Sequence, residues 1–390
     1  MAGKPAKPEQ PDRMEAAPPA EPPRDSPSGI SDARLEDLAR QHSRTRPVPR
    51  HRVQRFPLLG HLKEREQLLR EAAAQFREAS SGEPLTPAAE WMLDNYHLVL
   101  QSMRQFHEDM PPGFYRELPL LDAGALEGYP RIYAVAQELV VTSGAHLDLD
   151  RVNRFIRLYQ EITPLTMGEL WALPAILRLG ILECLAQSVG RLTGLSGQSS
   201  LPAMALPRDI KDEEVVANAI ISLRALDAQD WNDFFESVSR VEHLLRSDPA
   251  GVYQDMDRET RNRYRKAVEQ LARSSQRDEQ DVARLAVELA QSEAGTLSPQ
   301  QGIDAPRAAH VGWYLVDSGR RRLESRLGYR PSGRARIRRG ILRHATPVYL
   351  GSVALLTLAI LLAGMFYAWA SGAAALMIAV TGLLLLIPSL

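Results

Sequence analysis

The chain contains a single cysteine, Cys184, among its 390 residues. One cysteine excludes an intramolecular disulfide framework and any multi-cysteine metal cluster, and we expect Cys184 to be a small buried hydrophobic residue. Four motifs that would indicate an enzyme are also absent: the phosphate-binding P-loop, the dinucleotide-binding glycine fingerprint, the HExxH zinc motif and the nucleophile elbow. The formal net charge of −1 excludes a histone-like or strongly acidic protein.

Charge is nevertheless distributed unevenly along the chain. Between Asp317 and His344, ten arginines stand against two acidic residues, which gives a local charge of +8. The other residues must therefore sum to −9, and no side chain from 345 to 390 is charged. The near-neutral total hides an acidic N-terminal part, a basic segment and an uncharged C-terminal part.

Apolar residues recur at helical spacing through most of residues 61–327. One such stripe predicts a helix over 87–110, with Thr86 as its N-cap and Pro87 at its first position. Further stripes run from Val152 to Ile162, Val216 to Leu226, Tyr264 to Leu271 and Val282 to Leu289. Alternation of period two long enough for a sheet is absent, so the sequence predicts an all-α fold.

Composition divides the chain into further segments. Residues 1–60 hold eleven of the 27 prolines and are predicted to be disordered, apart from a short helix over 31–41. A linker rich in serine, glycine and proline at 196–208 is expected to separate two helical subdomains, 61–195 and 209–327. An arginine-rich juxtamembrane segment follows at 328–346.

The segment 169–185 is apolar nearly all round, which allows either a membrane span or a buried helix. It is only about 17 residues long, whereas a span needs about 20, and it contains Pro174, Arg178 and Glu183. We therefore expect a helix at the centre of the bundle, kinked at Pro174. Thr166 and Glu169 have the spacing of a capping box at its start.

The uncharged C-terminal part predicts a transmembrane hairpin. Residues 347–370 form the first predicted span, because about 20 apolar residues at ~1.5 Å each cross a ~30 Å hydrocarbon core. Residues 373–390 form a second, shorter span after a tight turn at 371–372. Aromatic residues expected at the two headgroup levels are Tyr349, Phe366, Tyr367 and Trp369.

The basic segment predicts the orientation of this hairpin. Positive charge within about 15 residues of a span retains a loop on the cytoplasmic side. The arginines at this distance are Arg334, Arg336, Arg338, Arg339 and Arg343. Nucleic-acid binding is the competing interpretation, and the adjacent span disfavours it. Because the chain stops within the second span, we expect the natural polypeptide or its ancestor to continue beyond residue 390.

Two carboxylate pairs have the DxD spacing that can hold a divalent cation against a sugar nucleotide. Asp148 and Asp150 form one pair, and Asp255 and Asp257 the other. Each pair also precedes a predicted helix, where carboxylates accept hydrogen bonds from the first free amides. We expect helix capping at both places rather than metal binding.

The remaining titratable candidates also have structural interpretations. His97 and His107 lie ten residues apart on different faces of the predicted 87–110 helix, which disfavours a shared metal. Glu138 and Glu183 stand in apolar helices and are candidates for general acids of raised pKa. Structural pairing with Arg178 or with other arginines is the alternative that we expect.

Six phrases of the sequence are long enough to be specific for a protein family. They are Glu90-Trp91-Met92-Leu93-Asp94-Asn95-Tyr96-His97, Pro112-Gly113-Phe114-Tyr115-Arg116-Glu117-Leu118-Pro119, Thr163-Pro164-Leu165-Thr166-Met167-Gly168-Glu169-Leu170-Trp171-Ala172-Leu173-Pro174, Phe234-Phe235-Glu236-Ser237-Val238-Ser239, Asp248-Pro249-Ala250-Gly251-Val252-Tyr253 and Leu327-Gly328-Tyr329-Arg330-Pro331. These phrases resemble the N-terminal region of bacterial cyclic β-1,2-glucan synthases. The similarity covers about residues 55–390, in order.

The resemblance implies a place in the synthesis of cyclic β-1,2-glucan from UDP-glucose. In that family, a helical region and a first pair of spans precede a cytoplasmic glycosyltransferase domain. Every catalytic motif of the family would then lie beyond Leu390, so no catalytic, cofactor-binding or metal-binding residue is carried over. Mg²⁺ and UDP-glucose are implied only for the missing domain.

We therefore expect a non-catalytic helical portion in a bacterial inner membrane, with its helical domain cytoplasmic. Its expected partners are the lipid bilayer and a glycosyltransferase domain in the same or a separate chain, with no nucleic acid. An independent inner-membrane helical adaptor is the alternative. A third hypothesis, a glycan-active enzyme using Asp148 and Asp150, is disfavoured by the capping interpretation.

Overall fold

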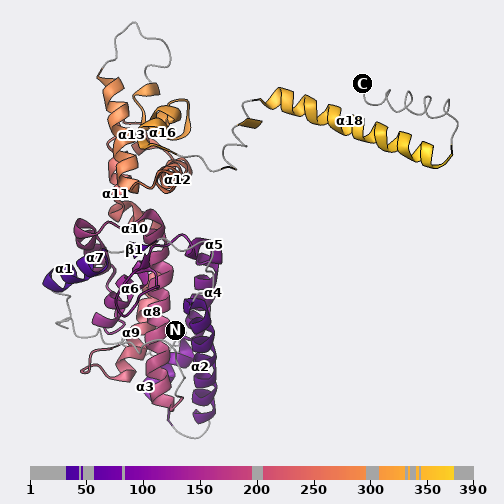
Figure 1. Ribbon diagram of the computed structural model, residues 1–390. Helices are drawn as coiled ribbons and strands as arrows, with labels where there is room; N and C mark the ends of the chain where they lie inside the picture. Colours follow the sequence, from indigo (N-terminus) through magenta and orange to yellow (C-terminus); the bar gives the residue numbers. More distant parts are fainter. Residues whose placement is uncertain are drawn as a thin grey trace, which may run out of the picture. The chain divides into compact units, whose positions relative to one another are not determined.

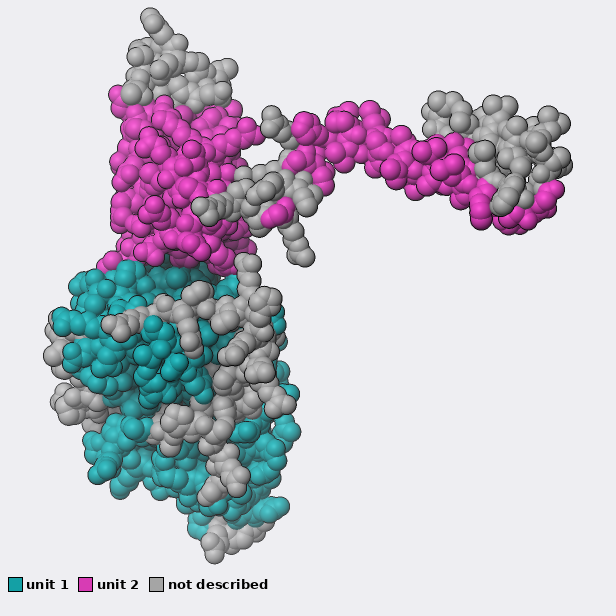
Figure 2. Space-filling model, viewed as in Figure 1, with its two compact units in different colours: residues 1–239 teal, residues 240–390 magenta. Residues whose placement is uncertain are grey.

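The computed structural model describes residues 32–43, 45–46, 57–80, 84–195, 205–295, 307–329, 333, 340–341 and 344–372. The chain forms two compact units, residues 1–239 and 240–390 (Figure 2). The predicted linker at 196–208 lies mostly outside the described residues. The units divide after Ser239 rather than at that linker, because the helix that follows the linker packs against the long helix that precedes it.

The described residues of unit 1 form helices and one minimal pair of strands (Figure 1). β1 and β2 pair antiparallel through two residues each. Its elements are α1 (Asp32–Gln41), β1 (Thr45–Arg46), α2 (Pro57–Ala79), α3 (Pro87–Asp94), α4 (Tyr96–Asp109), α5 (Pro112–Tyr115), β2 (Leu120–Leu121), α6 (Arg131–Thr142), α7 (Leu149–Ile162), α8 (Met167–Thr193), α9 (Asp212–Ala228) and α10 (Trp231–Val238). The all-α prediction is confirmed for the described part of the chain.

Helix α8 forms the core of unit 1 and packs against α2, α4, α6 and α9. It passes a composition test for a membrane span, but 94% of its most apolar window is buried inside the protein. The prediction of a buried central helix is therefore confirmed. The predicted capping box is present, since the Thr166 hydroxyl accepts from the Glu169 amide at 3.2 Å and the Glu169 carboxylate accepts from the Thr166 amide at 2.8 Å.

The helix predicted over 87–110 is two helices, α3 and α4, so that prediction is wrong at one position. Thr86 caps α3 as expected, with its hydroxyl accepting from the Ala89 amide. The helix is interrupted at Asn95, whose backbone dihedral angles, φ −110° and ψ 12°, lie outside the helical region. The Asn95 side chain donates to the Trp91 carbonyl at 3.0 Å. Local side-chain bonding of this kind competes with the helix, although the apolar stripe continues across the break.

The turn between α6 and α7 is held by α9. Gly144 and Ala145 both adopt positive φ, 56° and 63°. Asn218 donates to the Gly144 carbonyl at 3.1 Å, and the Ser222 hydroxyl donates to the Ala145 carbonyl at 2.7 Å. Ser222 also accepts from the Leu147 amide at 2.8 Å. These bonds satisfy buried backbone groups that the sharp turn would otherwise leave unpaired.

The helical body of unit 2 is built around α13, which contacts α11, α12, α15 and α16. The elements of this unit are α11 (Arg240–Leu245), the 3₁₀ helix η1 (Tyr253–Asp255), α12 (Arg258–Ser275), α13 (Glu279–Ala294), α15 (Val311–Val316), α16 (Arg320–Leu327) and α18 (Ala345–Ala370). Fully buried Glu242 accepts from Tyr253 at 2.7 Å, from Arg265 at 2.7 Å and from Arg261 at 3.2 Å. Buried Asp248 accepts from His310 Nδ1 at 2.7 Å.

Helix α18 exposes apolar side chains along its length, unlike the other described helices. It is one uninterrupted helix of 26 residues (yellow in Figure 1). Within its apolar stretch Ala345–Gly364, none of the most apolar 18-residue window is buried inside the protein. Leu355 and Leu356 are 71% and 62% exposed. By its length and composition, this exposed apolar helix is a candidate membrane span.

Candidate functional site

One aspartate of each carboxylate pair caps the helix that follows, as the capping interpretation predicted. Asp148 Oδ1 accepts from the amides of Asp150 and Arg151 at 2.9 and 3.3 Å at the start of α7. Asp257 accepts from the Thr260 amide at 2.8 Å at the start of α12, while Asp255 belongs to η1. Both capping aspartates are therefore explained by local backbone hydrogen bonds.

The two histidines on α4, His97 and His107, have exposed side chains. Within the described residues, no group of three or more histidine, cysteine, aspartate or glutamate side chains is arranged to hold a metal ion. Cys184 is buried in α8, as predicted, and burial raises the pKa of its thiol. None of these residues forms part of a candidate reactive centre.

Arg178 pairs with two aspartates rather than with Glu138 or Glu183. Its guanidinium donates to Asp227 at 3.0 Å and to Asp109 at 3.4 Å, linking α8 to α9 and to the end of α4. Glu183 therefore does not pair with Arg178, so the Arg178 part of that prediction is wrong; the arginine whose charge acts on the Glu183 carboxylate is Arg65. Arg178 and Glu183 are five residues apart on α8, so their side chains lie on different faces of the helix and contact different neighbours.

Glu183 is instead held by a tyrosine. The Tyr133 hydroxyl donates to Glu183 Oε2 at 2.9 Å, and Gln137 Nε2 donates to the Tyr133 oxygen at 2.8 Å. Glu183 Oε1 is buried and has no hydrogen-bond partner among the described residues. Burial raises the pKa of Glu183 to about 7, although the Tyr133 hydrogen bond and the positive charge of Arg65 oppose the shift.

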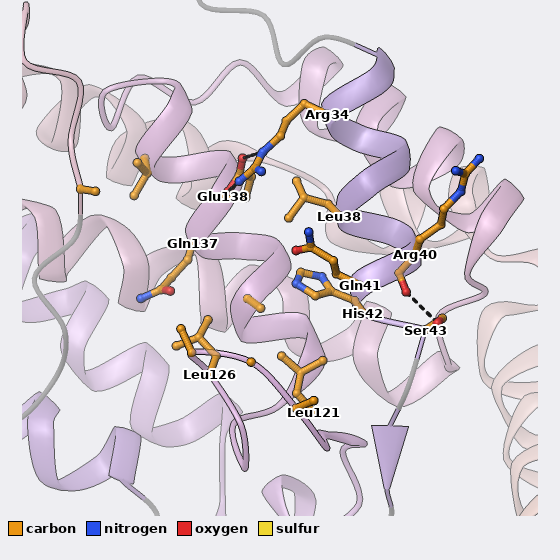
Figure 3. A pocket seen from close by; sticks show the side chains of 16 residues that line it. Arg34, Leu38, Arg40, Gln41, His42, Ser43, Leu121, Leu126, Gln137 and Glu138 are labelled. Atoms are coloured by element: carbon orange, nitrogen blue, oxygen red, sulfur yellow. Dashed lines mark hydrogen bonds and ion pairs between the residues drawn. The ribbon is translucent and has the colours of Figure 1, made fainter.

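Gln137 connects this buried chain of hydrogen bonds to a pocket of about 840 Å³. The pocket lies between α1, α6 and the loop that follows β2 (Figure 3). Its apolar lining comes from Leu38, Leu121, Ala123, Ala125, Leu126, Ala134, Val141 and Ala205. Its polar lining comes from Arg34, Arg40, Gln41, His42, Ser43, Gln137 and Glu138. Pockets of this volume and mixed lining are typical of small-molecule sites.

Two long-range contacts hold α1 over the pocket. Arg34 Nε donates to Glu138 Oε1 at 3.1 Å, so the predicted pairing of Glu138 with an arginine is confirmed. The Thr163 hydroxyl donates to the Ala39 carbonyl at 2.6 Å. Figure 3 shows the Arg34 and Glu138 side chains meeting between α1 and α6.

His42 is the titratable group of the pocket with the largest perturbation. Burial, with a smaller contribution from the positive charge of Arg131, lowers the pKa of the His42 imidazole to about 4. The imidazole is therefore neutral near pH 7. Its Nδ1 atom is buried and has no hydrogen-bond partner among the described residues.

The predicted membrane-facing residues are only partly within the described structure. Tyr349, Phe366 and Tyr367 lie on α18 and are 67%, 67% and 75% exposed. Trp369 lies in the last turn of α18, and its side chain is outside the described residues. The five arginines from 334 to 343 and the second predicted span at 373–390 also lie outside them, so their roles stay predictions.

No protein-family model matches the chain. The chain is, however, 28% identical over 341 residues to the cyclic β-(1,2)-glucan synthase NdvB of Rhizobium meliloti (strain 1021). The resemblance to cyclic β-1,2-glucan synthases is confirmed. The match covers 70% of this chain but only 12% of that relative, so the chain corresponds to a small part of the synthase.

Sequence reasoning identified Glu138 and Glu183 but missed the pocket beside them. Arg34 is 104 residues from Glu138, and Tyr133 is 50 residues from Glu183. No local spacing marks these pairs. The one local indication of the pocket is a pair of polar residues, Gln137 and Glu138, within the otherwise apolar sequence of α6.

Proposed function

We propose that this chain is the membrane-anchored helical portion of a cyclic β-1,2-glucan synthase system. In this role it positions a glycosyltransferase domain, in the same or a separate chain, at a bacterial inner membrane. The observation that carries the proposal is the 341-residue similarity to a cyclic β-(1,2)-glucan synthase.

Helix α18 supports the anchoring part of the proposal. At ~1.5 Å per residue, its 26 residues extend about 39 Å, enough to cross a ~30 Å hydrocarbon core. Its apolar side chains are exposed, with Tyr349 near one end and Phe366 and Tyr367 near the other. Amphipathic rings at both ends suit the two headgroup levels. Residues 373–390 return across the membrane in the proposed hairpin.

The arginine-rich segment before α18 sets the proposed orientation, with the helical body cytoplasmic and the turn at Ser371 on the opposite side. Periplasmic and cytoplasmic reporter fusions at Ser371 and at Gly333 test this arrangement. We expect periplasmic activity at Ser371 and cytoplasmic activity at Gly333. Cytoplasmic reporter activity at Ser371 would contradict the proposed transmembrane hairpin.

The proposal assigns this chain a positioning role rather than the chemistry. One aspartate of each DxD pair, Asp148 and Asp257, is engaged in a helix cap, at the starts of α7 and α12. UDP-glucose and Mg²⁺ then belong to the transferase domain. Purified full chain in detergent is expected to show no turnover of UDP-glucose with Mg²⁺. Robust glucan synthesis by the purified chain would overturn the positioning role.

A further inference from the structure

Helix α12 carries basic residues on the side that faces away from the core of unit 2. Its core side is formed by Tyr264, Val268 and Leu271, which are buried. At about 100° per residue, the opposite side carries residues 263, 266, 270 and 273 within an arc of about 80°. With the residue at 277 just beyond the helix, these exposed side chains form what we call the α12 basic stripe: Arg263, Lys266, Gln270, Arg273 and Arg277.

The backbone after α12 keeps Arg277 next to the helix. Gln276 adopts a left-handed conformation, with φ 55°, and ends the helix. The Arg277 amide donates to the Ala272 carbonyl at 3.1 Å, a bond that holds residue 277 against the last helical turn. Arg277 therefore continues the α12 basic stripe past the C-terminal end of the helix.

Three of the four charges in the α12 basic stripe have no ionic partner among the described residues. Arg273 forms an ion pair with Glu269 at 2.8 Å. Arg263, Lys266 and Arg277 form no ion pair within the described part of the chain. Their charge is therefore available to an anionic partner outside the helical body.

Charge is segregated between α12 and its neighbour α13. Helix α12 contains six basic and two acidic residues, whereas α13 contains one basic and four acidic residues. The two helices pack against each other, so positive and negative charge lie on different sides of one small body. Glu259, in the first turn of α12, is the acidic residue on the same side as the stripe. Such a separation of charge orients a body in the field of an extended charged surface.

The connection to α18 determines which charged surface is within reach. The 17 residues 328–344 join α16 to α18 and, even fully extended, would reach at most about 60 Å. A body tethered to a membrane span stays within that distance of the bilayer, so its docking on the bilayer is effectively intramolecular. The cytoplasmic leaflet carries anionic headgroups, which complement a row of lysine and arginine side chains.

We propose that the α12 basic stripe docks on the anionic lipid headgroups of the membrane that α18 crosses. This inference rests on the membrane span and the orientation given under the proposed function. The stripe contains no apolar side chain, so it lies on the headgroups and does not insert among the acyl chains. Docking holds the helical body of unit 2 with α12 against the bilayer and thereby fixes its orientation.

The experiment places the full chain in lipid nanodiscs and measures the approach of α12 to the bilayer by fluorescence quenching. A fluorophore on Gln270→Cys lies within the stripe without removing a charge, and the one native cysteine, Cys184, is buried. Lipids with a nitroxide headgroup quench the fluorophore when it is close. We expect strong quenching with about one-third phosphatidylglycerol and little with phosphatidylcholine alone. Raising salt from about 0.1 to 1 M shortens the screening length from about 10 to 3 Å and should remove the quenching.

Neutralising the stripe tests its residues directly. The triple variant Arg263→Gln/Lys266→Gln/Arg277→Gln should lower the ratio of docked to undocked chain on the order of 100-fold, because each basic residue near an anionic surface contributes about five-fold. All three side chains are exposed, so their replacement should leave the fold intact.

A charge-matched control removes three exposed arginines of unit 1 that also form no ion pair within the described residues. Arg104 lies on α4, and Arg154 and Arg157 lie on α7. The variant Arg104→Gln/Arg154→Gln/Arg157→Gln changes the net charge by the same amount and should be quenched like the wild-type chain.

Three results would overturn the assignment: equal quenching with and without phosphatidylglycerol, equal quenching in the stripe variant and the control, or release of α12 from the bilayer by a single-stranded RNA oligonucleotide, which would assign the stripe to nucleic acid. Carbonate extraction distinguishes these failures from failure of the proposed span. If the chain resists extraction but α12 is not quenched, only the docking is lost. If the chain is extracted, the membrane span itself fails.

Discussion

The buried ion pair between Arg131 and Glu169 gives the sharpest prediction about the stability of unit 1. Arg131 Nε donates to Glu169 Oε1 at 2.8 Å and Nη2 donates to Oε2 at 2.5 Å. The two side chains are 6% and 0% exposed. The pair joins the start of α6 to the start of α8, and Arg131 also donates to the Pro164 carbonyl at 3.0 Å. Glu169 belongs at the same time to the Thr166 capping box.

Removing one partner leaves the other charge buried without compensation. We expect Arg131→Met or Glu169→Leu each to lower the free energy of unfolding by about 3–5 kcal/mol. The double variant Arg131→Met/Glu169→Leu leaves no isolated charge and should cost less than the sum of the single changes, with a coupling energy of about 2 kcal/mol or more. The lost capping box should keep the double variant from exceeding the wild-type stability.

Urea unfolding of the full chain in detergent, followed by tryptophan fluorescence, measures these changes. Trp171 is a suitable probe, because it stacks on Phe235 within unit 1 at a centroid distance of 4.3 Å. The exposed α2 pair of Arg70 and Glu66 provides the control, and Arg70→Met should cost at most about 1 kcal/mol. Single variants within about 1 kcal/mol of wild type, or strictly additive effects, would refute the reasoning.

Three further predictions concern Glu183, the α6–α7 turn and α18. The folded pKa of Glu183 is about 7, above its ordinary 4.5, so the folded state holds the extra proton between these values and loses stability as pH rises through them. Glu183→Gln should abolish this loss, worth up to about 3 kcal/mol at pH 8, in urea unfolding across pH 5–8; an unchanged slope would exclude Glu183 as its source. Gly144→Ala should lower the thermal midpoint at a cost of about 1–2 kcal/mol, because φ is 56° and the new Cβ would lie 2.2 Å from Ile210 Cδ1; wild-type stability would show that the turn relaxes. Leu355→Arg/Leu358→Arg should add roughly 5–7 kcal/mol to the free energy of membrane insertion and release the chain into the supernatant on carbonate extraction, whereas the Leu358→Ile control should stay in the membrane pellet. A double variant that stays in the membrane pellet would argue against a span.

The helices were predictable where local sequence decides them. Thr86 before Pro87 and the Thr166–Glu169 capping box are short-range devices, and the structure contains both. The end of the stripe over 87–110 was also correct, but the break at Asn95 was not predicted. A side-chain hydrogen bond to Trp91 ends α3 there without interrupting the apolar periodicity.

The partners of the buried charged residues were not predictable, because the fold brings them together from distant parts of the chain. Arg178 is 69 residues from Asp109 and 49 from Asp227. The pocket depends in the same way on α1, which reaches α6 through the pair of Arg34 and Glu138. Apolar periodicity identifies which face of a helix is buried, but it does not identify which polar side chain of another helix will contact a polar residue on that face.

The central claim is that the helical body is required for cyclic β-1,2-glucan synthesis. An in-frame deletion of codons 57–329 in the native host, leaving α18 and all downstream sequence in place, tests this claim most directly. Periplasmic glucan is then measured by mass spectrometry, with the intact coding sequence restored as the control. The account predicts loss of cyclic glucan in the deletion strain and recovery on restoration. Wild-type amounts of cyclic glucan in the deletion strain would contradict it and favour an independent adaptor.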